Sequence, residues 1–375
     1  MPAIVAGWSL LHDAMIGVLL AAALVLLTPI LRTRGPWSRD LPLLYLGLCA
    51  VSVLPVVAIP TLGMAYARMQ WVTLATFAAI FVCAYTLSRR VPGVVMGFAA
   101  AWLSWAVFSA IRTIAAAVAH GRLTHDSVDL MGHTNSRAGF ELTMALFAIG
   151  VADSGGRKAR RVAVPLAVLL LAAIALGLSR GAWLGLLGAC LLIARRRWGW
   201  GRAVLILTGC ALVLALFPGP FGARARSVAD AGFSTNLFRL QMWNAVFRVI
   251  GENPWGGSGY DTLWFAMLSH LGAEIPTLAG KHVHNMLLQT WAETGLLGVA
   301  ALIGVFVAMM RDAETVRRDP RPWLRPFGWG ATLLLVGVVL HGLVDCTWRD
   351  YSQQVVFWSL AGWLAATASQ GRSSA

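Results

Sequence analysis

The segment HVHN at residues 282–285 places two histidines and an amide directly before a long apolar run, with Glu293 inside that run. Ionisable side chains are costly in a bilayer, so a polar cluster at the edge of an apolar segment is a candidate functional site. An imidazole, with an ordinary pKa of about 6.5, can accept a proton near neutral pH. We therefore predict His284 as a general base, with His282 and Asn285 beside it. The alternative is a histidine that only caps a helix or satisfies a core hydrogen bond.

Arginines in three other segments suit the recognition of phosphate groups. Arg180 lies in the short SRGAWL break between two apolar runs, Arg239 in the amphipathic run RLQMW, and Arg68 in YARMQW. A planar, permanently charged guanidinium binds phosphate oxygens in pairs. The alternatives are arginines whose side chains reach up to the membrane surface and, for Arg239, a helix that lies on that surface.

A fourth polar group is Asp345 in HGLVDCTWRD, four residues after His341 and therefore on the same face of a helix. Its carboxylate could hold a cation or orient a histidine, and a plain structural pair within the bundle is the alternative. His125, His133 and two nearby aspartates have the side chains of a metal site, but their spacing matches no known pattern. No nucleotide-binding loop accompanies them, so we predict neither a metal nor a cofactor.

The composition indicates the kind of elements that carry these residues. Hydrophobic residues make up 58% of the 375-residue chain and charged residues 12%, whereas soluble domains carry about 25% charge. The apolar runs are continuous and lack the alternation of a membrane barrel, so helices are the spanning element. We predict an all-α polytopic membrane protein with 11 to 12 transmembrane helices, organised as a single integral membrane domain over residues 1–375.

Eleven runs are predicted as spans, and a twelfth near residues 1–13 remains open. The predicted spans are 14–31, 41–60, 71–87, 94–119, 137–152, 162–178, 182–194, 203–217, 285–310, 328–344 and 352–368.

The net charge of +14 comes mainly from short arginine clusters between these runs. This is the pattern that the positive-inside rule requires of cytoplasmic loops. No nucleic-acid-reading motif accompanies the charge, so we predict no nucleic-acid partner. With the basic loops inside, the Gly- and Pro-rich segment 218–284 becomes one large loop on the outer side that carries short helices; the resemblance described next makes this side the periplasm.

The chain resembles the bacterial O-antigen ligase and O-antigen polymerase family of inner-membrane glycosyltransferases. The family pattern H-[NSQ]-x9-G-x-x-G is matched by His284, Asn285, Gly295 and Gly298. Its R-x3-L pattern is matched by Arg180 and Leu184, and its R…W…PxxGxG pattern by Arg239, Trp243, Pro254, Gly257 and Gly259.

The resemblance implies the transfer of a glycan from undecaprenyl diphosphate to lipid A-core oligosaccharide on the periplasmic face of the inner membrane. It also implies that His284 is the catalytic base and that Arg180 and Arg239 bind the donor diphosphate, with no nucleotide, ATP or metal. Arg68 would be a further phosphate contact. His282, Asn285 and Asp345 complete the predicted substrate site.

Two other functions remain open at this point. An O-antigen or exopolysaccharide polymerase would use a second lipid-linked glycan as acceptor. A transporter of lipid-linked oligosaccharide is a different class, but it predicts inverted repeats and broken helices at matched positions, and we find neither in the sequence.

Overall fold

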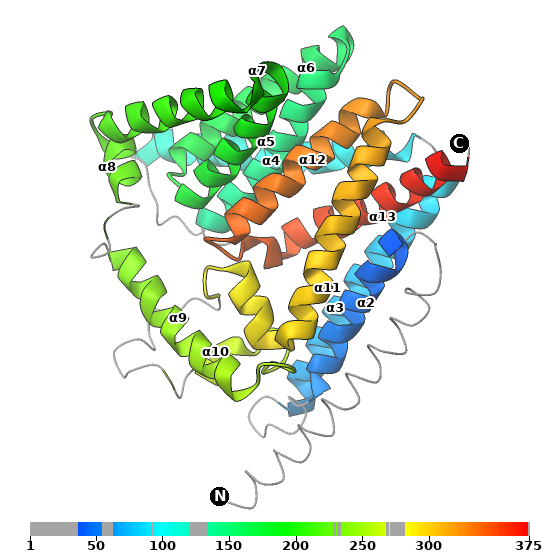
Figure 1. Cartoon of the computed structure of the whole chain (residues 1–375), viewed down its shortest axis with the longest axis vertical. Helices are drawn as coiled ribbons and strands as arrows, with labels where there is room; N and C mark the ends of the chain where they lie inside the picture. The colour runs from blue at the N-terminus through cyan, green and yellow to red at the C-terminus, as the bar shows by residue number, and fades with distance from the viewer. Residues whose placement is uncertain are drawn as a thin grey trace, which may run out of the picture.

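The computed structural model describes residues 37–54, 63–91, 93–120, 134–227, 230, 234–267, 270 and 282–373. Within this part of the chain every regular element is a helix (Figure 1). In chain order the elements are α2 (Trp37–Ser52), α3 (Gly63–Arg90), α4 (Val94–His120), α5 (Thr134–Ser154), α6 (Arg157–Leu176), α7 (Arg180–Leu216), α8 (Pro220–Arg226), α9 (Ser234–Glu252), α10 (Leu263–Met267), α11 (Met286–Arg317), α12 (Arg325–Gly342), the 3-10 helix η2 (Thr347–Arg349) and α13 (Tyr351–Ser373).

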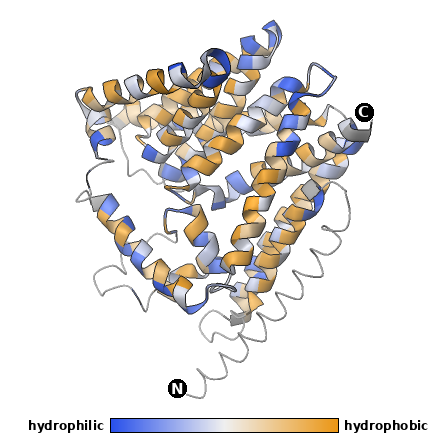
Figure 2. Ribbon diagram, viewed as in Figure 1, coloured by the Kyte–Doolittle hydropathy of each residue, from blue (hydrophilic) through white to orange (hydrophobic). Residues whose placement is uncertain are grey.

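Four helices of the described residues are long and apolar enough to cross a membrane, namely Met64–Arg90, Val94–Ala119, Arg157–Leu176 and Met286–Arg317. They coincide with four of the predicted spans, and the prediction of an all-α, multi-pass membrane protein is confirmed. The long helices are mainly apolar along their length (Figure 2). The predicted first span, 14–31, falls outside the residues that the structure describes, so the total of 11 to 12 spans stays a prediction.

The predicted loop at 195–202 is instead helical on both sides of one residue. The helical backbone of α7 is interrupted at Gly199, where φ is 79°, and continues after it. Arginine is a good helix former, so the basic cluster prolongs the helix where a loop was expected. Glycine adopts a positive φ without a steric penalty, which places the change of direction at this residue.

The bundle is built on close helix pairs. Helix α5 packs against α6 and α12, α13 packs against α3, and α11 packs against α2 and α12 (Figure 1). Small residues bring α5 and α12 together, since a Cβ added to Gly150 would overlap the backbone of Gly330. Such small-residue contacts are typical of helix pairs in membranes. The large fully buried side chains include Trp358, Trp363 and Tyr45.

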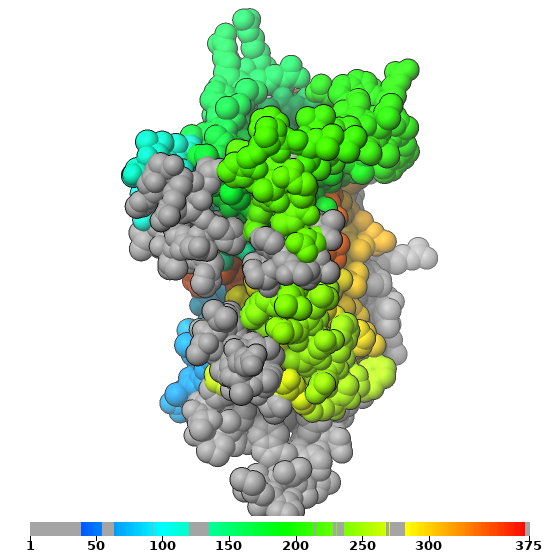
Figure 3. Space-filling model, turned by 90° about the vertical axis from the view of Figure 1, so that its left-hand side faces the viewer, coloured from blue at the N-terminus to red at the C-terminus, as the bar shows by residue number. Residues whose placement is uncertain are grey.

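The segment 218–284 contains α8, α9 and α10, as the prediction of short helices within it required. Helices α8 and α9 lie on one face of the molecule, below α7 (Figure 3). A second, smaller apolar cluster of Met242, Val246, Leu263, Val283 and Ala292 joins α9 and α10 to the start of α11. This cluster positions Arg239 of α9 near the start of α11, where the HVHN segment lies.

Candidate functional site

The backbone on both sides of His284 is held by side-chain hydrogen bonds. Asn285 caps α11 by accepting a hydrogen bond from the Leu288 amide at 3.0 Å, and its own amide donates to the Leu343 carbonyl at 2.9 Å. Before the histidine, the Trp243 indole donates to the Val283 carbonyl at 2.8 Å. His284 has a φ of 54°, a conformation that costs about 1–3 kcal/mol for a residue other than glycine and persists where the surroundings impose it. These contacts supply that constraint.

His284 and Asp345 form a hydrogen-bonded pair. The His284 Nδ1 atom lies 3.1 Å from Asp345 Oδ1, which also accepts from the Cys346 amide at 2.8 Å. Burial opposes ionisation of Asp345, but the hydrogen bond from His284 and the electrostatic interactions with His284, His341 and Arg239 outweigh it and hold its pKa below the ordinary value. An ionised carboxylate has no proton to give, so Nδ1–H is the donor, and in the neutral form of the ring the lone pair is on Nε2.

Arg239 completes this chain of charges from the other side. Its guanidinium lies 3.7 Å from Asp345 Oδ2 and its side chain is 19% exposed. Asp345 is therefore shared between a histidine and an arginine that are far apart in the sequence. The carboxylate of Asp345 thus contacts a cation and a histidine, the two partners that the sequence suggested for it.

Arg180 begins α7 and faces α8 and α9. Its guanidinium donates to the Ser227 carbonyl at 2.9 Å, while Arg224 of α8 donates to the Leu178 carbonyl at 3.1 Å. Burial, followed by the charges of Arg224 and Arg239, lowers the pKa of Arg180 to about 10. Burial and the charge of Arg239 also lower the pKa of Arg224. Three guanidinium groups therefore lie within electrostatic reach of one another, an arrangement that favours a multiply charged anion.

The backbone turns just before Arg180, in the short break between two apolar runs. The sharp change of direction is at Leu178, where φ is 48°, while Gly181 lies within the helix. Gly181 has a different role, because a Cβ there would overlap the ring of His341. His341 contacts Thr347 Oγ1 at 3.2 Å.

The glycines of the two remaining motifs pack against each other. Helix α11 breaks at Gly295, where φ is 68°, and a Cβ there would overlap the Trp255 carbonyl. The PWGGSG segment, residues 254–259, fits this break. The amides of Ser258 and Gly259 donate to the Ala292 and Glu293 carbonyls at 2.7 and 2.8 Å. These glycines therefore have a structural role, since they join α11 to the segment that follows Arg239.

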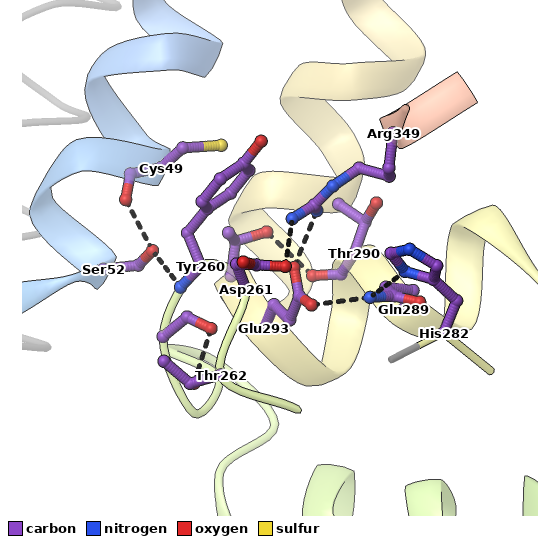
Figure 4. Close-up of polar contacts among 12 residues, drawn as sticks. Cys49, Ser52, Tyr260, Asp261, Thr262, His282, Gln289, Thr290, Glu293 and Arg349 are labelled. Carbon is purple, nitrogen blue, oxygen red and sulfur yellow. Dashed lines mark hydrogen bonds and ion pairs between the residues drawn. The ribbon is translucent and has the colours of Figure 1, made fainter. Parts of the chain in front are cut away.

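A buried ion-pair network lies next to this junction, around Glu293 and Asp261 (Figure 4). Arg349 donates to Glu293 at 2.7 Å, lies 3.9 Å from Asp261, and stands 3.9 Å over the Tyr260 ring. The side chains of Arg349 and Glu293 are 3% and 0% exposed. Tyr66 of α3 donates to the carboxylate of Asp261 at 3.0 Å, which ties α3 to the same network.

His282 belongs to this network and not to the His284 pair. Gln289 donates to Glu293 at 2.7 Å, contacts His282 Nδ1 at 3.4 Å and accepts from the Val283 amide at 3.2 Å. Burial, and next the charge of Arg349, lower the pKa of His282 to about 4. The ring is therefore neutral at neutral pH and accepts from Gln289, as drawn in Figure 4.

The structure thus brings four of the predicted residues, Arg239, His284, Asn285 and Asp345, into direct or adjacent contact, and places Arg180 within electrostatic reach of Arg239. Arg68 is exposed on α3, and in the described part of the chain it forms no ion pair with these residues. The possible metal ligands His125 and His133 lie outside the described residues.

Sequence reasoning missed Arg224, Asp261 and the pairing partner of Glu293. Arg224 carried a usable signal, because it is a cation in the same predicted periplasmic segment as Arg239. Asp261 lies two residues after the glycine motif and is the only acidic residue between Asn253 and Ala273. The partner of Glu293, Arg349, lies 56 residues later, and only the fold brings the two together.

Comparison with known proteins gives the context for this geometry. Residues 165–303 match the family described as O-antigen ligase. The chain is also 28% identical, over 175 residues, to the O-antigen ligase of Salmonella typhimurium, and the aligned region spans 42% of this chain and 43% of that relative. The matched residues contain Arg180, Arg239, His284 and the glycine motifs. The similarity to O-antigen ligases thus covers the segment that carries these residues, and it spans less than half of this chain and of the relative.

Proposed function

We propose that the protein is a glycosyltransferase of the O-antigen ligase type, which moves a glycan from undecaprenyl diphosphate to lipid A-core oligosaccharide on the periplasmic face of the inner membrane. The observation that carries the proposal is the Arg239–Asp345–His284 chain, with Arg180 and Arg224 beside it. It combines a base with a cluster of positive charges, and these are the two groups that such a transfer requires.

In this proposal, His284 is the general base. With Nδ1–H donated to Asp345, the Nε2 lone pair accepts the proton of the acceptor hydroxyl. The hydroxyl oxygen then bonds to the anomeric carbon as the bond from that carbon to the diphosphate oxygen breaks. Asp345 stabilises the imidazolium that forms, and it keeps the ring oriented.

The arginines act on the leaving group. Breaking the bond leaves the diphosphate with additional negative charge, and Arg180, Arg239 and Arg224 lie where they could neutralise it. Fixed charges of this kind need no rearrangement during the reaction. Losing one such contact costs on the order of 2.7–4 kcal/mol, by analogy with oxyanion-hole donors.

Purified protein supplied with undecaprenyl diphosphate-linked glycan and lipid A-core should form a new glycosidic bond, and the product should also form in EDTA. Mass spectrometry of the acceptor measures the product. If the protein elongates a second lipid-linked glycan and does not modify lipid A-core, it is a polymerase and not a ligase. Failure with both acceptors would contradict a transferase, and strict dependence on a divalent metal would contradict the role given to the arginines.

Arg180→Lys is expected to lower the kcat/KM of transfer by about 10²- to 10³-fold. Lysine keeps the charge, but a point charge cannot bind two phosphate oxygens in the way that a guanidinium does. Steady-state rates against donor concentration measure the effect.

The matched control is Arg226→Lys, an exposed arginine of α8 whose guanidinium donates to the Ala215 carbonyl. This variant should transfer at close to the wild-type rate. Equal rates for Arg180→Lys and Arg226→Lys would mean that Arg180 is only a cation at the membrane surface.

A further inference from the structure

A second cationic site lies where α5 meets α6, among residues that the proposed transfer does not use. An open cleft of about 670 Å³ is lined by Arg157, Arg160 and Arg161, with Val164 and Pro165 along its apolar wall. The middle of α7 lies at the same end of the molecule (Figure 3). Its Arg196 and Arg197 both pair with Asp153, at the end of α5.

Positive side chains outnumber negative ones around this cleft. Asp153 is the only acidic residue between Glu141 and Asp230, and its carboxylate already contacts Arg196, Arg197 and the Trp329 indole.

Of the three arginines in the cleft, Arg160 donates to the carbonyls of Ala152 and Asp153. Arg157 and Arg161 are exposed, and no carboxylate of the described chain lies within ion-pair distance of either. The cleft therefore presents guanidinium groups to whatever enters it.

The wall of the cleft continues into a membrane-spanning surface. Helix α6 is one of the four helices long and apolar enough to cross a membrane. Its Val162, Val164 and Val168 are 63%, 47% and 61% exposed, as expected of side chains that face lipid. The arginines thus stand in the first turns of a lipid-facing helix, where a charged head group would lie directly above an apolar stem.

We propose that this cleft binds the phosphate of an anionic phospholipid, with the acyl chains along the exposed valines of α6. Guanidinium forks bind phosphate oxygens in pairs, and basic pockets at the ends of membrane helices bind anionic head groups. The positive-inside rule accounts for cations in this loop, but it does not require three of them to line one cleft. The apolar wall favours a lipid over free phosphate.

Native mass spectrometry of the full-length protein, with dioleoylphosphatidylglycerol added in neutral detergent micelles, tests this site. The wild type should retain this lipid in preference to dioleoylphosphatidylcholine. The double variant Arg157→Gln/Arg161→Gln should bind it about 25-fold more weakly, at roughly fivefold for each arginine. The control is Arg89→Gln/Arg90→Gln, which removes two exposed arginines from the end of α3 and should retain the wild-type affinity.

Three outcomes would overturn the proposal. Equal losses in the two double variants would mean a diffuse attraction to all basic loops. Equal binding of the two phospholipids by the wild type would remove the anionic head group from the argument. Competition by millimolar inorganic phosphate as effective as that by the lipid would assign the cleft to a soluble phosphate. Thermal unfolding of each variant in detergent confirms that it is folded before its affinity is compared.

Discussion

Replacing His284 by alanine is expected to lower the rate of glycan transfer by about 10²- to 10⁴-fold, the contribution of a positioned general base. The reason is geometric, because Asp345 holds the Nδ1 side of the ring and leaves Nε2 for the acceptor hydroxyl. Methyl replaces the ring at a partly exposed position, so the fold should survive. Initial rates at saturating donor, together with thermal unfolding in detergent, measure both effects.

The matched control for this variant is His270→Ala. His270 lies in the same segment of the sequence, but its ring pairs with Glu252 at 3.0 Å and has no contact with Asp345 in the described structure. It should transfer at a rate within about twofold of the wild type. Full activity of His284→Ala, in a protein that inserts normally, would reduce His284 to a residue that only shapes the start of α11.

Replacing Arg349 by methionine is expected to destabilise the fold by about 3–5 kcal/mol. Glu293 is fully buried and loses its 2.7 Å ion pair, which leaves an uncompensated charge among α11, η2 and the Tyr260 ring. Breaking one side of a buried pair costs far more than the intact pair contributes, because the remaining ion keeps its desolvation penalty. Denaturant unfolding in detergent micelles measures the free energy change.

Two further variants separate this explanation from a general effect of losing an arginine. Arg349→Met/Glu293→Gln removes both charges and should recover most of the loss. Arg311→Met removes an exposed arginine of the same α11 and should change stability by less than about 0.5 kcal/mol. Wild-type stability of Arg349→Met, or no recovery in the double variant, would contradict the ion-pair explanation.

The sequence predicted the elements better than the contacts between them. Continuous apolar runs identify membrane helices because the bilayer leaves few other options, and α3, α4, α6 and α11 followed. The break between 182–194 and 203–217 was placed in a loop, whereas the structure confines it to Gly199. Apolarity locates the ends of a hydrophobic run, but arginines prolong a helix beyond them, so the run does not mark where the helix stops.

The candidate site shows the same limit. His284, Arg180 and Arg239 were found because histidine and arginine are unusual at a membrane edge, and this signal is local. The pairing of His284 with Asp345 joins residues 61 positions apart. From the sequence alone, Asp345 could have held a cation or oriented a histidine, and nothing near it in the sequence distinguished the two roles. Arg224 could have been found in the same way, as an arginine at a membrane edge. The Arg349–Glu293–Asp261 network could not, because it depends on how α11, η2 and the PWGGSG segment pack.

The length of helix α11 also indicates how deep the buried ion pair lies in the membrane. Arg311 is the first charged residue at one end of its apolar stretch, and the break at Gly295, next to Glu293, lies roughly 16 residues away, or about 24 Å along the helix. The hydrocarbon core is about 30 Å thick, so the Arg349–Glu293 pair lies just within its far boundary. Before Gly295 the chain changes direction, and Asn285 donates to the Leu343 carbonyl, which ties the HVHN segment to the end of α12. Helix α12 has 18 residues, a length of about 27 Å, so its far end and His284 lie near this same boundary, where the diphosphate of the proposed donor would sit while its polyprenyl tail stays in the hydrocarbon.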